Sequence, residues 1–238
     1  MEKSLLRKKA RKKQLKMKKK WENSGVKVSK SLRDIIHGYT MSDGFIRNGI
    51  LTVDQNVKQK LFVLWLYEKF QHIRTSSPIK EVSRIHPKTK RTSQSLRFFT
   101  KAVLNGFHSM WYKPVINKEG VLNYKKKLPK NMSGFFNETF ISVWYAADGT
   151  KILGSLGAKF EVTSFTIVER LKLKALFFSK FQIKTEIISS GVSKNGNPQW
   201  ALKIPAKEYP KFRNLITKLD LIPTLFPYKL HKKKTFSS

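Results

Sequence analysis

Two segments of the chain share one pattern, and this repeat restricts the possible folds more than any other feature. Residues 36–44 (IHGYTMSDG) and 141–149 (ISVWYAADG) each read as an apolar helix that ends in Asp-Gly. Two strands, a helix, two more strands and a final helix are expected after each helix, so that each half has the order αββαββα. A repeat of about 105 residues predicts two related halves with pseudo-twofold symmetry, and not a solenoid of short units.

The first half is predicted to extend over residues 28–117. It starts with a helix over 31–44, and Asn48-Gly49, a pair typical of type I′ turns, joins the two short strands that follow. An amphipathic helix is predicted over 57–73. Its buried face is expected to consist of Leu61, Leu64, Tyr67 and Phe70.

The second half is predicted over residues 134–238, with an amphipathic helix over 167–183. The buried face of this helix is expected to consist of Leu171, Ala175, Phe178 and Phe181. A basic, turn-rich linker is predicted between the halves, over 118–133. Residues 1–27 form a basic tail, which we expect to bind phosphate groups as a nonspecific arm.

The charge of the chain indicates the class of its partner. Lys and Arg outnumber Asp and Glu by 49 to 15, which gives a net charge of +34 at pH 7. Such an excess repels itself in a compact fold and favours a polyanionic partner such as nucleic acid. A ribosomal or general RNA-binding protein has the same composition, so charge alone does not identify the function.

Several classes of function lack their sequence signals. The chain has no cysteine, which excludes disulfides, zinc fingers of the Cys type and thiol nucleophiles. The five histidines show no zinc-ligand spacing such as HExxH, and the Gly-rich phosphate loop of nucleotide hydrolases is absent. No run of about 18 apolar residues exists, so neither a membrane-spanning helix nor a membrane partner is expected.

Asp43 and Asp148 occupy an electrostatically unfavourable position, because the C-terminal end of a helix already carries partial negative charge. A single copy is explained by an Asp-Gly pair that ends a helix before a turn. Two matched copies in a basic chain favour a bound cation instead. A hard divalent cation takes carboxylate and carbonyl oxygens, and the carbonyls of Ser42 and Ala147 lack partners within their helices. Small residues such as Gly38 would let the two helices approach closely.

These features resemble the LAGLIDADG homing endonuclease family, in its branch with two motifs in one chain. The second motif departs from the family at Val143, where a glycine is common. The stretches after the motifs, 53–70 and 160–187, also resemble the family, as does the terminal FPYKLH. The similarity covers nearly all of residues 28–231.

The resemblance implies an α+β fold in which two αββαββα halves form a saddle of antiparallel sheets, with the two motif helices at their interface. It implies a monomer that binds double-stranded DNA at a long recognition site and cleaves both strands with Mg²⁺, for which Mn²⁺ substitutes. Asp43 and Asp148, with the carbonyls of Ser42 and Ala147, are the metal ligands that it implies.

Further site residues follow from the resemblance. Lys229 matches a family lysine that stabilises charge or orients water, and Lys126 is its counterpart in the first half; an ordinary phosphate contact is the alternative for both. Gln55 is expected to position water, with Thr163 as its counterpart. Strand side chains are expected to contact bases or phosphates, and the candidates are Arg47, Thr52, Arg84, Lys88, Lys90, Arg91, Lys159, Lys184, Lys194 and Lys203.

Two other functions remain open at this point. A maturase on the same scaffold binds structured group I intron RNA and assists splicing, with or without cleavage, but the matched pair Asp43 and Asp148 favours the nuclease. A basic ribosome-associated or structural RNA-binding protein predicts neither a matched acidic pair nor an internal repeat. The composition, rich in Lys, Ile and Phe, indicates an A/T-rich genome and, with the family, a mitochondrion or chloroplast.

Overall fold

The computed structural model describes residues 28–230 except 86, 88, 117–119 and 153. The chain divides into two compact units. The first contains Gly44–Ser109 and the described residues before Arg33, and the second contains Arg33–Asp43 and the chain from Met110 onward. Both motif aspartates therefore lie in the second unit, although the repeat in the sequence is consecutive. The basic tail predicted over 1–27 lies outside the described residues.

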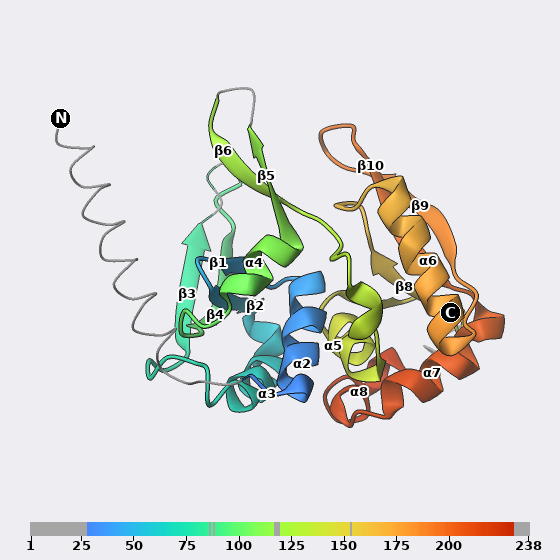
Figure 1. Cartoon of the computed structure of the whole chain (residues 1–238), viewed down its shortest axis with the longest axis horizontal. Helices are drawn as coiled ribbons and strands as arrows, with labels where there is room; N and C mark the ends of the chain where they lie inside the picture. Colours follow the sequence, from blue (N-terminus) through green and yellow to red (C-terminus); the bar gives the residue numbers. More distant parts are fainter. Residues whose placement is uncertain (1–27, 86, 88, 117–119, 153, 231–238) are drawn as a thin grey trace. The chain divides into compact units, whose positions relative to one another are not determined.

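The order of elements confirms the predicted αββαββα repeat (Figure 1). The first copy consists of α2 (Lys30–Met41), β1 (Phe45–Arg47), β2 (Ile50–Asn56), α3 (Lys60–Lys69), β3 (Lys80–Ile85), β4 (Thr92–Phe99) and α4 (Asn105–Trp111). The second consists of α5 (Glu138–Asp148), β7 (Thr150–Lys151), β8 (Ala158–Glu161), α6 (Ile167–Phe181), β9 (Glu186–Val192), β10 (Pro198–Ile204) and α7 (Tyr209–Thr217). The helix α8 (Leu221–Leu225) and a 3-10 turn (Pro227–Lys229) follow. Among the described residues, no helix has the length and apolar character needed to cross a membrane.

The first unit is built on an antiparallel sheet with the strand order β1-β2-β4-β3. The turn between β1 and β2 has positive φ angles at both Asn48 (51°) and Gly49 (75°). A type I′ turn requires such angles, so the predicted hairpin is confirmed. The sheet buries Leu51, Val53 and Phe98 on one face, and α3 packs against β2 and β4.

The predicted buried face of α3 is wrong in part. Phe70 is buried as expected, but Leu61 is 62% exposed and Leu64 is also exposed, whereas Phe62 and Leu66 are fully buried. All six residues from Leu61 to Leu66 are apolar. Periodicity therefore does not define which side of the helix faces the core. The contact with the sheet decides it, and places Phe62 and Leu66, four residues apart, inward.

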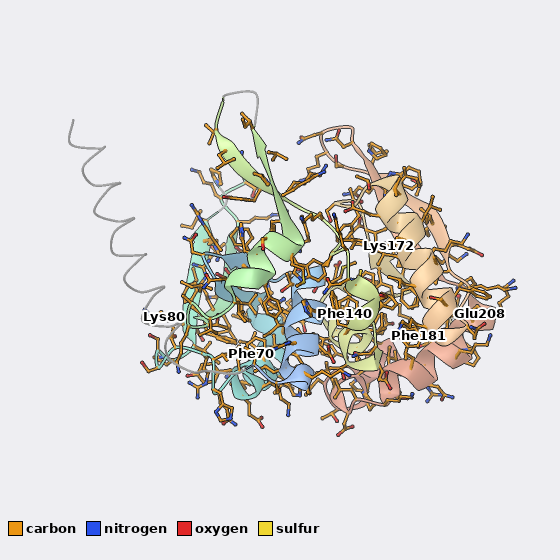
Figure 2. The ribbon with its side chains drawn as sticks, in the orientation of Figure 1. Phe70, Lys80, Phe140, Lys172, Phe181 and Glu208 are labelled. Atoms are coloured by element: carbon orange, nitrogen blue, oxygen red, sulfur yellow. The ribbon has the colours of Figure 1, made fainter. Side chains whose placement is uncertain are left out.

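The second unit is built on the sheet β7-β8-β10-β9, with an aromatic core between this sheet and its helices. Trp144 of α5 packs against Phe160 of β8, with ring centroids 4.1 Å apart, and Phe212 of α7 lies 5.8 Å from Phe160. Phe140, one turn before Trp144, lies in the interior of the unit, 5.4 Å from Phe136 (Figure 2). These contacts fix α5 firmly against the sheet.

The predicted buried face of α6 is also wrong in part. Leu171, Ala175 and Phe178 are exposed, while Leu173 and Phe177 are fully buried. The helix carries apolar residues on more than one side, so either face could have been buried. The aromatic core selects Phe177, whose ring lies 5.9 Å from that of Phe160.

The helices α2 and α5 approach each other closely in the second unit, as the small residues predicted. A Cβ atom on Gly38 would lie 2.6 Å from the carbonyl oxygen of Phe140 and 2.9 Å from the Cβ of Val143. The side-chain amide of Asn137, the N-cap residue of α5, donates to a carboxylate oxygen of Asp34 at 2.7 Å. It is Gly38 that makes room for the close approach of the two helices, because the residue of α5 that faces it is Val143 and not a second glycine.

A two-stranded antiparallel ribbon precedes α5. It consists of β5 (Tyr112–Ile116) and β6 (Leu122–Lys126). The sequence predicted a turn-rich linker over 118–133, and the structure shows that part of this linker is a strand. The alternation in LNYKK is too weak to indicate a strand alone, and β6 forms because β5, which lies before the predicted linker, is its partner.

Candidate active site

The two motif helices bring Asp43 and Asp148 into one compact unit. α2 ends at Met41, and Asp43 follows in a turn, whereas Asp148 is the last residue of α5 and Gly149 is its C-cap. The two positions match in sequence but differ in environment, because Asp43 is exposed and Asp148 is half-buried. The pair is therefore asymmetric.

Each of these helix ends is bound by one lysine. The ammonium of Lys126, at the end of β6, donates to the carbonyl oxygens of Thr40 and Ser42, both at 2.7 Å. The ammonium of Lys229 donates to the carbonyl oxygens of Tyr145 (2.8 Å), Ala146 (2.9 Å) and Gly149 (2.8 Å). A cation at a helix C-terminus offsets the negative end of the helix dipole.

The lysines change one expectation about the helix ends. From the sequence, the carbonyls at the ends of the motif helices, including that of Ser42, were expected to lack partners. In the structure, Lys126 donates to the carbonyl of Ser42, and Lys229 donates to carbonyls at the end of α5. A carbonyl oxygen has two lone pairs, so the bond from Lys126 leaves Ser42 able to accept a further interaction. The structure thus brings Lys126 and Lys229 to equivalent places beside Asp43 and Asp148.

Burial and mutual charge shift the pKa values of this cluster toward neutrality. Burial, followed by the nearby charges of Asp43 and Glu161, raises the pKa of Asp148 to about 7, against the opposing effect of Lys126 and Lys229. Burial lowers the pKa of Lys126 and of Lys229, and although the two aspartates raise both values, each pKa is still about 8. Perturbed pairs of this kind concentrate at functional sites.

The oxygen donors of this cluster suit a hard divalent cation. Two carboxylates with the backbone carbonyls of Ser42 and Ala147 are the ligand type that Mg²⁺ prefers, and a cation would favour the charged form of Asp148. In the part of the chain that the structure describes, no three His, Cys, Asp or Glu side chains form a metal-binding group.

A comparison with protein-family sequence models identifies the family of the chain. The sequence model of the LAGLIDADG DNA endonuclease family matches residues 33–212. This range includes most of α2, all of α5, both four-stranded sheets and Lys126. The chain belongs to the LAGLIDADG DNA endonuclease family. No curated protein sequence matches the chain.

One solved structure shows the same fold. The homing endonuclease I-WcaI, bound to its DNA recognition sequence, matches with a TM-score of 0.72 and 17% sequence identity, over 90% of this chain and 92% of that chain. Full-length DUF199/WhiA from Thermatoga maritima matches with a TM-score of 0.48 and 13% identity, over 90% of this chain and 66% of that one. The likeness to I-WcaI confirms the predicted two-part LAGLIDADG fold.

The sheet registers relate Glu161, which the sequence reasoning did not single out, to Asp54 of the first sheet. Phe45 and Thr150 each follow their motif aspartate by two residues, and they pair with Thr52 and Lys159. Two residues further on, Asp54 and Glu161 are therefore equivalent. By the same register, the counterpart of Gln55 is Val162, and the predicted counterpart Thr163 is displaced by one residue.

Glu161 belongs to the electrostatic surroundings of Asp148, because its charge contributes to the raised pKa of that carboxyl, after burial and Asp43. Its carboxylate accepts hydrogen bonds from the backbone N–H of Thr163 (3.0 Å) and the hydroxyl of Ser190 (3.3 Å). Gln55 lies on the core side of β2 in the first unit and is buried. The alternation of β8, with buried Phe160 and Val162, was the signal that could have identified Glu161.

The predicted nucleic-acid contacts fall into three groups. Arg47, Thr52 and Arg84 lie on the face of the first sheet that α3 does not cover, and Lys159 and Lys203 are cross-strand neighbours on the corresponding face of the second sheet. Lys90, Arg91, Lys184 and Lys194 lie in the connections next to the strands. Lys88 lies outside the described residues. Roles in DNA contact stay predictions for all of them.

One basic residue of the first sheet was missed by the sequence reasoning. Arg97 of β4 pairs with Asp54 on the open face, where its Nε donates to the Asp54 carboxylate at 2.9 Å, and Arg84 donates to the same carboxylate. The pKa of Asp54 is lowered: burial acts against the shift, while hydrogen bonds from Ser95, Arg97 and Arg84 favour the charged form. Asp54 thus holds two arginines in fixed positions on the face that we expect to meet DNA.

Proposed function

We propose that this protein is a site-specific DNA endonuclease that makes a double-strand break with Mg²⁺. The observation that carries the proposal is the matched arrangement of Asp43 with Lys126 and Asp148 with Lys229 at the ends of two adjacent helices. Membership of the LAGLIDADG DNA endonuclease family supports it. The solved structure of I-WcaI with its DNA recognition sequence supports a DNA partner.

The residues of the cluster have distinct roles in phosphodiester hydrolysis. Asp43 and Asp148, with the carbonyls of Ser42 and Ala147, would hold the divalent cation. When bound, Mg²⁺ supplies Lewis-acid stabilisation of charge on the phosphate and lowers the pKa of water. Lys126 and Lys229 orient the helix ends through their carbonyl bonds and place positive charge where negative charge develops on the phosphate oxygens.

The pKa values of the cluster suit such chemistry near neutral pH. Asp148 has a pKa of about 7 with both lysines present, and a bound cation would favour its charged form further. The lysines, with pKa values of about 8, stay largely protonated at pH 7. We expect cleavage to rise with pH as Asp148 ionises, and because the bound cation favours the charged carboxylate, this rise should lie below pH 7.

Cleavage of a plasmid library of candidate sites, with Mg²⁺ or with EDTA, tests the proposal. We expect the wild type to linearise one sequence only with Mg²⁺, and Asp43→Asn and Asp148→Asn each to lose the double-strand break while retaining DNA binding. Asp220→Asn is the matched control, because Asp220 is exposed and its side chain caps no helix. It should cleave like the wild type.

Two outcomes would contradict the proposal in different ways. Absence of cleavage with every divalent metal, together with tight binding to a structured group I intron RNA that neither substitution disturbs, would indicate a maturase. Cleavage that survives both substitutions would show that the aspartates are helix ends without a catalytic role. We further propose that the enzyme acts as a monomer, because one chain carries both motifs; a dimer in size-exclusion chromatography would contradict this.

A further inference from the structure

The ribbon formed by β5 and β6 has two chemically different faces. Directly opposite residues of an antiparallel pair project to the same side. Pro114 pairs with Tyr124, and Ile116 pairs with Leu122, so these four side chains form one face, which we call the apolar ribbon face. The other face carries Lys113, Val115, Asn123 and Lys125.

The apolar ribbon face is open to solvent. Ile116 is 75% exposed, Leu122 is 56% exposed and Tyr124 is 43% exposed. A two-stranded ribbon is only marginally stable by itself, and uncovered apolar side chains on it give no stability to the free protein. A patch of this kind on a projecting element indicates a binding surface.

The base of the ribbon is part of the active site. Tyr112 is buried, and the backbone N–H of Lys127 donates to the carbonyl oxygen of Trp111 at 2.8 Å, which closes the base. Lys126, the last residue of β6, bonds to the carbonyls of Thr40 and Ser42 beside Asp43. Tyr112 pairs with Lys126, so the Lys126 side chain projects to the same side of the ribbon as the apolar ribbon face, and that face begins next to the active site.

The orientation and charge of the ribbon favour DNA as the occupant. Lys113 interacts electrostatically with Glu169 near the start of α6, so the polar face is directed toward α6 and the apolar face away from it. Figure 1 shows the ribbon projecting from its unit. Lys113 and Lys125 lie on the polar face, Lys126 lies at the base, and none of the ten strand residues is acidic, so the ribbon as a whole suits a polyanion.

We propose that the apolar ribbon face binds the DNA major groove beside the cleavage site and reads thymine through its methyl group; this rests on the proposed endonuclease function. The major groove is about 12 Å wide and admits a two-stranded ribbon, and the thymine methyl is the apolar feature of base edges there. Five residues extend the ribbon by about 16 Å, which exceeds the groove depth of about 8.5 Å.

The geometry predicts where the contact lies. Leu122 is four residues from Lys126, which corresponds to about 13 Å along an extended strand. Since successive base pairs rise by about 3.4 Å, the apolar ribbon face meets bases about four pairs from the phosphate next to Lys126. The sites that the protein selects should therefore contain thymine in this window, on one side of the cut.

Exchanging thymine for deoxyuridine, which removes only the methyl group, tests the proposal directly. With wild-type protein and the selected site, we expect about a fourfold loss of affinity for each contacted methyl. The double variant Ile116→Asn and Leu122→Asn should bind the thymine site at least about tenfold more weakly and should not distinguish deoxyuridine from thymine. The double variant Leu171→Asn and Phe178→Asn is the matched control, because it removes two exposed apolar side chains from α6.

The outcomes separate this proposal from the endonuclease function. If the wild type cleaves with Mg²⁺ but ignores the exchange at every position within about six pairs of the cut, the ribbon proposal fails and the endonuclease function stands. The ribbon variant could instead bind DNA as tightly as the wild type but no longer form a dimer that the wild type forms. That result would overturn the proposal and show that a second copy of the chain covers the apolar ribbon face. If the wild type binds the site without cleaving, the endonuclease function fails, and the exchange still decides the ribbon contact. An unchanged melting temperature checks that the ribbon variant is folded.

Discussion

Replacing Gly38 with alanine tests whether the contact between α2 and α5 holds the two motif aspartates in place. The new Cβ would lie 2.6 Å from the carbonyl oxygen of Phe140, and this atom belongs to a helix backbone that cannot rotate away. Alanine favours a helix over glycine by about 1 kcal/mol, whereas overpacking a core costs about 1–3 kcal/mol. Because two contacts are shorter than 3 Å, we expect a net loss of about 1–2 kcal/mol in the free energy of unfolding.

A second helical glycine provides the matched control. A Cβ on Gly106, in α4, would meet no atom within 4 Å. Gly106→Ala should therefore stabilise the protein by up to about 1 kcal/mol, through helix propensity alone. Urea denaturation of both variants at one pH gives the two free energies, and they should differ from the wild type with opposite signs.

The cleavage rate should depend on the contact between α2 and α5. Pushing α2 away from α5 moves Asp43 relative to Asp148, and a displacement of about 1 Å at a catalytic group costs up to about 100-fold in rate. Gly38→Ala should thus cleave at least tenfold more slowly than the wild type, with DNA affinity little changed, while Gly106→Ala retains both. A Gly38→Ala protein that is as stable as Gly106→Ala, or that cleaves at the wild-type rate, would refute the reasoning.

Three further predictions follow from the second unit. Burial, with a smaller effect of the Arg33 charge, lowers the pKa of His37 from 6.5 to about 4, so that below pH 6.5 the unfolded chain binds a proton more strongly than the folded protein. Between pH 7.5 and 5 the wild type should therefore lose about 2 kcal/mol more in free energy of unfolding than His37→Gln. Equal losses in the two proteins would contradict the lowered pKa of His37. Lys229→Met leaves three carbonyls at the end of α5 without their donor. We expect the cleavage rate in single-turnover assays to fall by about 100-fold. The free energy of unfolding, measured by urea titration, should fall by about 1–3 kcal/mol. Leu173→Ala should lower the free energy of unfolding by about 2–5 kcal/mol and Leu171→Ala by under about 1 kcal/mol, because only Leu173 is buried. Comparable melting temperatures for the two variants would argue against the observed buried face of α6.

Local sequence signals predicted those features that depend on neighbouring residues. The Asn48-Gly49 hairpin formed because both residues tolerate positive φ angles. The motif helices and the order αββαββα followed from periodicity and from Asp-Gly helix ends. The lysine beside each helix end was predicted through the family resemblance, and the structure adds the carbonyl oxygens that Lys126 and Lys229 bind.

Features that depend on distant contacts were not visible in the sequence. The buried sides of α3 and α6 were predicted wrongly in part, because apolar residues occur on several sides of both helices and only the facing sheet selects one. Glu161 emerged from strand register, since the pairing of Thr150 with Lys159 sets which residues of β8 face the open side.

Composition and residues a few positions apart were enough to predict the repeat and the element order, and they are the basis for expecting a polyanionic partner and a site at the two aspartates. The tertiary structure decided which helix faces are buried, that Gly38 makes room for α5, and that β6 pairs with β5 to form a ribbon ending on Lys126. The physical reason is that burial and pairing energies belong to contacts between residues far apart in the chain, and folding alone brings those residues together.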